Sequence, residues 1–516
     1  MTTRTAISAA VLAVLLNGGQ VRAQQPATTR ALSLEDARAL AVARTEDVAA
    51  ARAGQRRAGA QVRAARSSFW PQLSGYGSYD RSIKSEYEGL FDAGMGMGME
   101  GMEGIDELPF GRDNTWRLGL SLTQELWSFG RSLRRLAGAR AGQRQADIAV
   151  GSAAAQAELS AAQAYYDALL ADQLLQIAQV TLGQAQETLR ITELGRVKGQ
   201  TPEFDLLRAQ VTRDNQLSVV TQRRSDRDLA LVRLKQVIGL PLADAVALTT
   251  PLEDAAEVRE AERLAGQRTQ GSPAPADVVR ALTGHDIARV QAEAGRRAPV
   301  RQAREALSAR EEALGAARAE RWPTLSLTSD YGIVNYPIDV FPGTDDWRTN
   351  WTVGVFLSVP LFTGFRTSAD IDAAEADVDE ARARLQQTRR AAAVDSLSAS
   401  EQVAVARATW DQNARTVSQA QRAYQIADLR FQQGISNHLD LVDARVQLDQ
   451  ARVNRARAAH DLRVARIRVE LLPRLPLTGA AAANQVAPAN SQPAPAPSAP
   501  AQAAGTGAPR APGAAQ

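Results

Sequence analysis

The sequence predicts a mainly α-helical protein with a small β-barrel contribution, built from two similar halves. Three observations lead to this fold class: two very long segments without proline, four short stretches in which apolar and polar residues alternate, and a repeat of both patterns along the 516-residue chain. Long uninterrupted segments are typical of extended helices, and strict alternation is typical of strands with one apolar face. We therefore expect long helical hairpins and four strands in each chain.

The composition and the lack of catalytic motifs argue against an enzyme. Aromatic residues make up only 5% of the chain, so a large globular core is not expected. The net charge of +3 is spread without a basic block, so no nucleic acid partner is expected. The chain has no cysteine, and its three histidines, His285, His438 and His460, lie far apart. No nucleophile elbow, phosphate loop or metal-ligand cluster is present, and we expect no catalysis, cofactor or metal site.

The two ends of the chain have the features of processed or unstructured segments. Residues 1–23 carry Arg4, a short apolar run and small residues at Val21 and Ala23, which predicts a signal peptide. The apolar run is too short to span a bilayer, and no stretch of 18 or more apolar residues follows. If the exported chain enters a membrane, it must do so as a barrel. Residues 474–516 are rich in alanine and proline and are expected to be disordered.

The apolar face of the four alternating stretches must be shielded from water, either by a packing layer or by lipid. The polar, alanine-rich helices that follow offer no bulky layer, whereas a membrane barrel turns such a face toward lipid. Four strands cannot close a barrel, so several chains must contribute. Eight residues are expected on the lipid face: Trp116, Leu118, Leu120, Leu122, Trp351, Val353, Val355 and Leu357.

A constant spacing relates the two halves. Trp116 and Trp351 are 235 positions apart, and so are Arg131 and Arg366 and several further identical pairs, which argues for an internal duplication. Each long helix should have about 64 residues, or about 95 Å at the usual rise. We expect a first repeat over 24–240, which contains a helix over about 33–67, strands 70–80 and 115–125, a long helix 131–194, a tip 195–202 and a helix 203–238. An equatorial connection is expected over 241–282. The second repeat, over 283–473, should contain a helix over about 285–320, strands 322–334 and 350–360, a long helix 366–429, a tip 430–437 and a helix 438–472.

Several motifs resemble those of the TolC family of outer-membrane channel proteins over most of residues 33–473. The strand-to-helix corners "ELWSFGR" and "PLFTGFR" and the segment "RFQQGISNHLDLVDAR" carry the resemblance, with Glu125 where the family corner has proline. The resemblance implies a homotrimer with a twelve-stranded barrel in the outer membrane and a helical tunnel in the periplasm. It also implies the exit duct of a tripartite efflux pump or type I secretion system, with a periplasmic adaptor and an inner-membrane transporter as partners.

The resemblance also implies site residues. Asp440 and Asp443 correspond to aspartates that ring the periplasmic constriction. The less favoured alternative is a solvated helix face or a favourable interaction with the helix dipole. Asp205 corresponds to a gate tether. Because Ser436 stands at the family's basic position, the candidate partners are Arg430, Arg196 and Lys198. The candidate adaptor contacts, whose glycines would suit any tight turn, are Val197, Gly199, Gln200, Phe431, Gly434, Ile435 and Ser436. The alternative function is a periplasmic coiled-coil scaffold or interaction protein.

Overall fold

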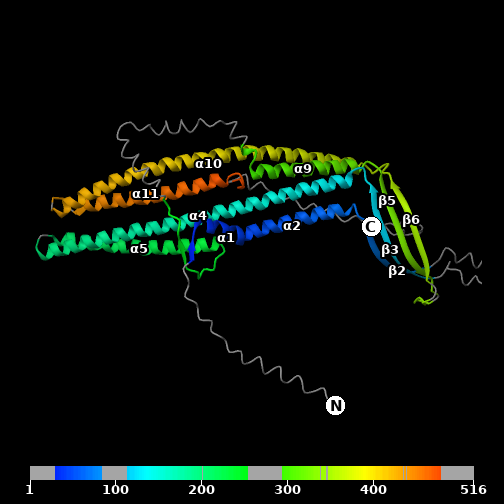
Figure 1. Cartoon of the computed structure of the whole chain (residues 1–516), viewed down its shortest axis with the longest axis horizontal. Coiled ribbons are helices and arrows are strands. Elements are labelled where there is room, and N and C mark those ends of the chain that lie inside the picture. Colours follow the sequence, from blue (N-terminus) through cyan, green and yellow to red (C-terminus); the bar gives the residue numbers. More distant parts are fainter. Residues whose placement is uncertain are drawn as a thin grey trace, which may run out of the picture. The chain divides into compact units, whose positions relative to one another are not determined.

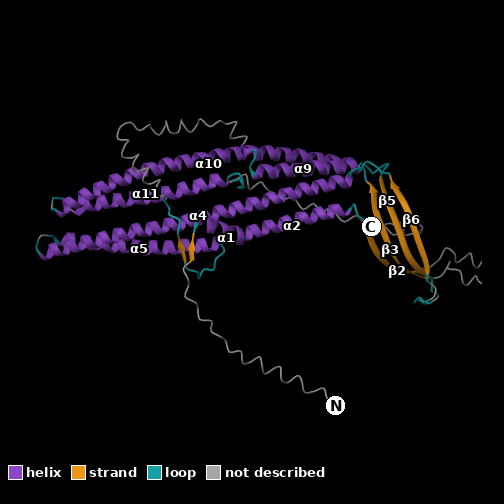
Figure 2. Cartoon of the chain, in the orientation of Figure 1, coloured by secondary structure: helices purple, strands orange, loops and turns teal. Residues whose placement is uncertain are grey.

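The computed structural model describes two long helices, five shorter helices and two sheets (Figures 1 and 2). The described residues are 30–83, 113–199, 201–253, 293–337, 339–344, 347–433, 435–436 and 438–477. The expected signal peptide, residues 254–282 of the expected connection and the expected tail from residue 478 on lie outside them. Residues 474–477 of that tail are described, and Leu475 is buried in the helical core, so the folded chain extends to Leu477.

The helices follow the same order in both halves of the chain. In the first half they are α1 (Leu34–Arg44), α2 (Glu46–Ser67), α4 (Arg131–Val197) and α5 (Glu203–Val237). In the second half they are α9 (Ala298–Ala319), α10 (Arg366–Gln432) and α11 (His438–Leu471). Both long helices, α4 and α10, contain 67 residues. No helix in the described ranges is both long enough and apolar enough to cross a membrane.

Two helix boundaries differ from the expectation. A single helix over about 33–67 was expected, but the chain is extended at Thr45, which separates α1 from α2. The Thr45 hydroxyl donates to the Ala41 carbonyl at 2.6 Å, a local bond that competes with helix continuation. The helix expected over about 285–320 is α9, which begins at Ala298. Pro299 lies in its first turn, where a missing N–H costs nothing.

The helices pack through narrow seams of small side chains. Helix α4 packs against α2, α5, α9 and α11, and α10 packs against α9 and α11 (Figure 1). Alanines predominate in the two main clusters, and the largest buried side chains are Trp410 and Tyr165. Because alanine lets helix axes approach closely, the chain builds long hairpins without a bulky core. This explains the low aromatic content.

A two-stranded sheet that the sequence did not indicate forms just before the first helix, α1. Strand β1 (Arg30–Leu32) pairs in parallel with β4 (Val246–Leu248), within the expected connection. The Tyr165 hydroxyl of α4 donates to the Leu32 carbonyl and accepts from the Thr250 N–H, both at 3.0 Å. These bonds attach both strands to the middle of α4.

The larger sheet has four antiparallel strands in the order β2-β3-β5-β6. The strands are β2 (Gln72–Arg81), β3 (Asn114–Trp127), β5 (Thr324–Asn335) and β6 (Arg348–Ser358). The two hairpins share one register: Gln72 faces Thr123 in the first, and Thr324 faces Ser358 in the second. Within the described residues β2 and β6 each have one strand neighbour, so the sheet has two open edges.

Candidate functional site

The strand register brings the eight expected lipid-facing residues onto one face of the sheet. Trp351 lies opposite Tyr331, which lies opposite Leu120, and directly opposed residues share a face. Most of these side chains are exposed, with Val353 at 64%, while Trp116 and Leu122 are half-buried. Continuous exposed apolar surface of this kind marks an interaction surface. The face is therefore suited to lipid or to another apolar partner.

The opposite face of the sheet is mainly polar. It carries Thr328, Asp330 and an ion pair in which Arg117 Nη1 lies 2.9 Å from Asp80 Oδ2. Tyr76 lies over Gly119, where an added Cβ would be 2.8 Å from the end of the tyrosine side chain and would displace it. Phe356 is a further aromatic side chain on this face and is exposed.

The corner between β3 and α4 has polar bonds that explain the absence of proline there. Glu125 accepts a hydrogen bond from Arg131 at 2.8 Å and another from the Ser132 hydroxyl. A proline at this position would lose both bonds. The carboxylate thus connects the end of the strand to the first turn of the helix.

The two helix tips present apolar side chains to solvent. Val197 is 86% exposed at the first tip, and Ile435 is exposed at the second. Gly199 has a positive φ of 72°, which favours glycine at the turn after α4. Phe431 and Ser436 are half-buried. The expected adaptor contacts Gln200 and Gly434 lie outside the described residues.

Asp440 and Asp443 lie exposed on one face at the start of α11. The opposite face of this helix carries the buried residues Leu441, Arg445 and Leu448. The Gln447 side chain donates to Asp443 at 3.0 Å. Their position leaves both carboxylates clear of the packing between helices of one chain, so they are accessible from outside it.

The expected tether residues are not joined within one chain. Asp205 is half-buried in the first turn of α5, and Arg430 is exposed in the last turn of α10. No ion pair links them in the described part of the chain, where the first tip instead has Arg196 Nη2 at 3.5 Å from Glu203 Oε2. A tether between these residues would have to form between chains, which stays a proposal.

Sequence reasoning missed a polar seam between α4 and α11. Arg445 is buried and donates to the Thr188 hydroxyl at 2.9 Å. One turn further along, burial raises the pKa of Asp449, although a hydrogen bond with Thr181 and the charges of Arg452 and Arg445 oppose the rise. The signal available in the sequence was that Arg445 and Asp449 share a face with Leu441 and Leu448.

His460 forms a second polar link between these helices. Its Nε2 lies 2.9 Å from Asp167 Oδ1 on α4, and its Nδ1 lies 3.0 Å from Asp461 Oδ1. Burial lowers the pKa of His460, but the hydrogen bonds and charges of Asp167 and Asp461 outweigh it and raise the pKa above 6.5. No group of three or more potential metal ligands occurs in the described ranges.

We expect replacement of His460 by glutamine to destabilise the protein more at acidic than at alkaline pH. The folded-state pKa is raised, so the stabilisation from the protonated ring is fully present below 6.5 and is lost as the pH rises through the folded-state value. Thermal unfolding of both proteins across this range measures the difference. A constant difference at all pH values would contradict the assignment.

The sequence matches the family model described as outer membrane efflux protein over residues 37–240 and 290–472. Outer membrane protein OprJ of Pseudomonas aeruginosa is 26% identical over 347 residues, which cover 64% of this chain and 64% of that protein. Solvent efflux pump outer membrane protein SrpC of Pseudomonas putida is 25% identical, covering 65% of this chain and 66% of its own length. The matches thus span just under two thirds of the length of these two relatives.

Solved structures with this fold include that of CusC. It superposes with a TM-score of 0.66 at 20% sequence identity and covers 85% of this chain and 91% of its own. The open state of the MtrE outer membrane channel of Neisseria gonorrhoeae gives a TM-score of 0.65 at 18% identity, with 86% and 89% coverage. At these identities the likeness establishes the fold.

Proposed function

Because this chain belongs to the outer membrane efflux protein family, we propose that three copies form the outer-membrane exit channel of an efflux pump. Each copy contributes four strands, so three copies close a barrel of twelve. The observation that carries this proposal is the sheet itself. It combines one exposed apolar face, one mainly polar face and two open edges, as a segment of a lipid-embedded barrel requires.

The helix tips are the proposed contact with a periplasmic adaptor, and through it with an inner-membrane transporter. Val197 and Ile435 expose apolar side chains at the ends of the two helical hairpins. A partner with a complementary apolar groove would remove them from water. The similarity to SrpC, a solvent efflux pump outer membrane protein, supports the pump context.

The constriction of the channel is proposed at Asp440 and Asp443. Three copies place six carboxylates around one axis, a ring that favours cations and binds divalent ions. The exposed position of both side chains at the start of α11 supports this assignment.

Replacing both Asp440 and Asp443 with alanine is expected to weaken the block of single-channel current by magnesium in planar bilayers. The half-blocking concentration should rise several-fold because the carboxylate ring is lost. The matched control replaces Asp377 and Glu380, which are also three residues apart and exposed, but lie on α10. Unchanged block in the Asp440 and Asp443 variant, or an equal change in the control, would reject the constriction.

A further inference from the structure

The end of β6 lacks a strand partner that its counterpart in the first half has. The 235-residue spacing relates Thr123 to Ser358 and Trp127 to Phe362. Beyond Thr123, strand β3 continues to Trp127 because its last residues pair with β5, Trp127 facing Leu325. Strand β6 ends at Ser358. The four residues that follow therefore correspond to a paired stretch of β3, but in one described chain no strand lies beside them.

An aromatic stack completes the corner within the chain. Phe129 follows β3 and lies parallel to Trp322, with ring centroids 4.3 Å apart and planes 9° apart. Trp322 stands two residues before β5, as Trp70 stands two residues before β2. Trp70 is 63% exposed, compared with 51% for Trp322, and no ring of the described chain stacks on Trp70. The tryptophan before the edge strand therefore has the same position as Trp322 without its aromatic cover.

The corner after β6 exposes two aromatic rings, and one of them, Phe365, stands one residue beyond Gly364, the counterpart of Phe129 at the 235-residue spacing. Phe365 is 78% exposed, and Phe362 and Leu361 are similarly open to solvent. Phe129 and Phe365 are the two non-glycine residues with positive φ in the described chain, at 51° and 65°. Such a conformation is costly for a bulky residue unless surrounding contacts stabilise it. The stack on Trp322 stabilises Phe129, whereas the ring near Phe365 in its own chain is Phe362.

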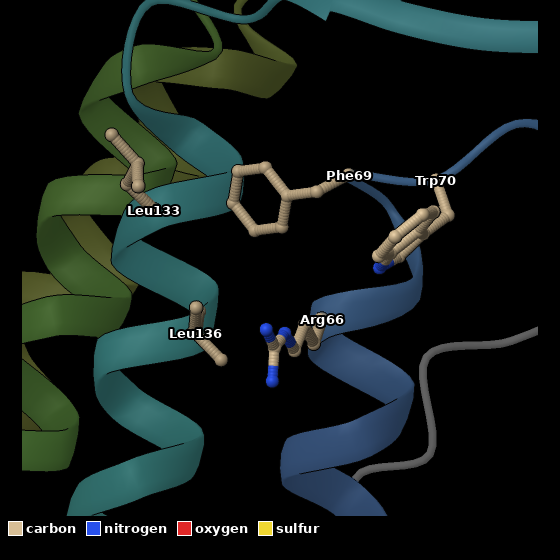
Figure 3. Close-up of a pocket in the computed structure, with 5 residues that line it drawn as sticks. All are labelled: Arg66, Phe69, Trp70, Leu133 and Leu136. Carbon is tan, nitrogen blue, oxygen red and sulfur yellow. The ribbon is translucent and has the colours of Figure 1, made fainter.

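A cavity beside Trp70 has room for these rings. It has a volume of about 350 Å³ and is lined by Arg66, Phe69, Trp70, Leu133 and Leu136, from the end of α2 and the start of α4 (Figure 3). Phe69 points toward the leucines of α4, and Trp70 lies above Arg66 in this view (Figure 3). Its size is at the low end of ligand sites, which span about 300–1,000 Å³. The lining is suited to one or two aromatic side chains.

We propose that Phe362 and Phe365 of one copy pack into this cavity against Trp70 of the partner subunit. Residues 359–362 then extend β6 along the edge strand β2 of that copy, as the end of β3 lies along β5. The strand directions permit this, because the start of β2 and the end of β6 lie at the same end of the antiparallel sheet. Pro360, which has no N–H, is tolerated at such an edge. The inference rests on the proposed trimer. It assigns the contact between neighbouring copies at this corner, which is called the seam below.

Cysteine cross-linking tests the seam directly, because the natural chain has no cysteine. Trp70→Cys combined with Phe365→Cys is expected to give covalent dimers and trimers with a short bismaleimide on denaturing gels. The matched control, Phe129→Cys with Trp322→Cys, should link within the chain and migrate as a monomer. Native mass spectrometry of each variant establishes whether it is still a trimer. A trimer without interchain links would overturn the seam and leave the channel intact, whereas a monomeric wild-type protein would overturn the proposed function.

Ring variants test the energetic role of the seam. Trp70→Ala and Phe365→Ala are each expected to lower the temperature at which the trimer separates. The double variant should lose little more than the larger single change, because both rings form one contact. Trp70→Phe should retain much of the stability. Additive or absent effects would contradict the contact, as would a loss of co-purified phospholipid in Trp70→Ala without a change in trimer stability, since the occupant would then be lipid.

Discussion

Replacing Arg297 with methionine is expected to lower the free energy of unfolding by about 3–5 kcal/mol, the usual cost of breaking a buried ion pair from one side. Arg297 is 2% exposed, and its Nη2 lies 2.8 Å from Oδ2 of Asp395, whose side chain is 11% exposed. It also donates to the carbonyls of Ala392 at 3.1 Å and Leu472 at 3.2 Å. One guanidinium thus joins the start of α9 to α10 and to the end of α11. Methionine fills similar space but removes these three bonds, so Asp395 loses this partner and keeps its pair with Arg468 at 3.1 Å.

The control for this variant is Arg310→Met. Arg310 forms an exposed pair with Asp377 at 2.9 Å between the same two helices, α9 and α10, and exposed pairs contribute about 0–1 kcal/mol. Denaturant unfolding in detergent, followed by the helical circular dichroism signal, compares both variants. A double change of Arg297 and Asp395 to apolar residues should be less harmful than the single arginine change. Equal small losses in both single variants would show that the buried pair does not stabilise the helices.

Replacing Val353 with arginine is expected to cost about 2–4 kcal/mol of insertion free energy, the effect of a cation on the lipid face near the bilayer midplane. Val353 is exposed on the apolar face of β6, opposite Ser329 of β5. The adjacent Thr352 points to the other face, opposite Asp330, so Thr352→Arg is the matched control and should cost little. Urea titration of folding into phospholipid vesicles measures both. Equal losses for the two variants would mean that the apolar face does not meet lipid.

The sequence carried the information for the strands and long helices because their periodicities are local. Alternation at Trp351 to Leu357 fixes which side chains share a face, and the same alternation at Trp116 to Leu122 fixes the other set. The register then joins the two sets through β5, whose residues they face. The fold class was therefore predictable, and the structural neighbours support it.

Contacts between distant segments were not predictable in the same way. The β1–β4 pair joins residues about 216 positions apart, in two stretches of three residues each, too short to have a periodicity. Arg297 is one arginine among many on α9 and α10, and only the packing of three helices distinguishes it from exposed residues such as Arg310. The break between α1 and α2 at Thr45 depends on a local side-chain hydrogen bond. The surrounding alanine-rich sequence favours a helix and gave no sign of this break.

Some candidate sites follow from local spacing in the sequence, and others depend on contacts between distant segments or between chains. The exposure of Asp440 and Asp443 follows from their position on the helix face opposite Leu441 and Leu448, which the apolar spacing of α11 indicates. The tether could not be placed from one chain, because Asp205 and Arg430 belong to different tips and do not pair within it. The polar seam of Arg445 and Thr188 depends on the approach of α4 to α11, which has no local signature.

The most direct test of the account is sedimentation equilibrium of the mature protein extracted from outer membranes with a mild detergent. We predict that the protein occurs in the outer-membrane fraction and sediments with three times the mass of one chain after correction for detergent. The contradicting result is a protein that is released without detergent and sediments as a single chain. In that case the exposed apolar face of the sheet would have no lipid to cover it, and the channel would not exist.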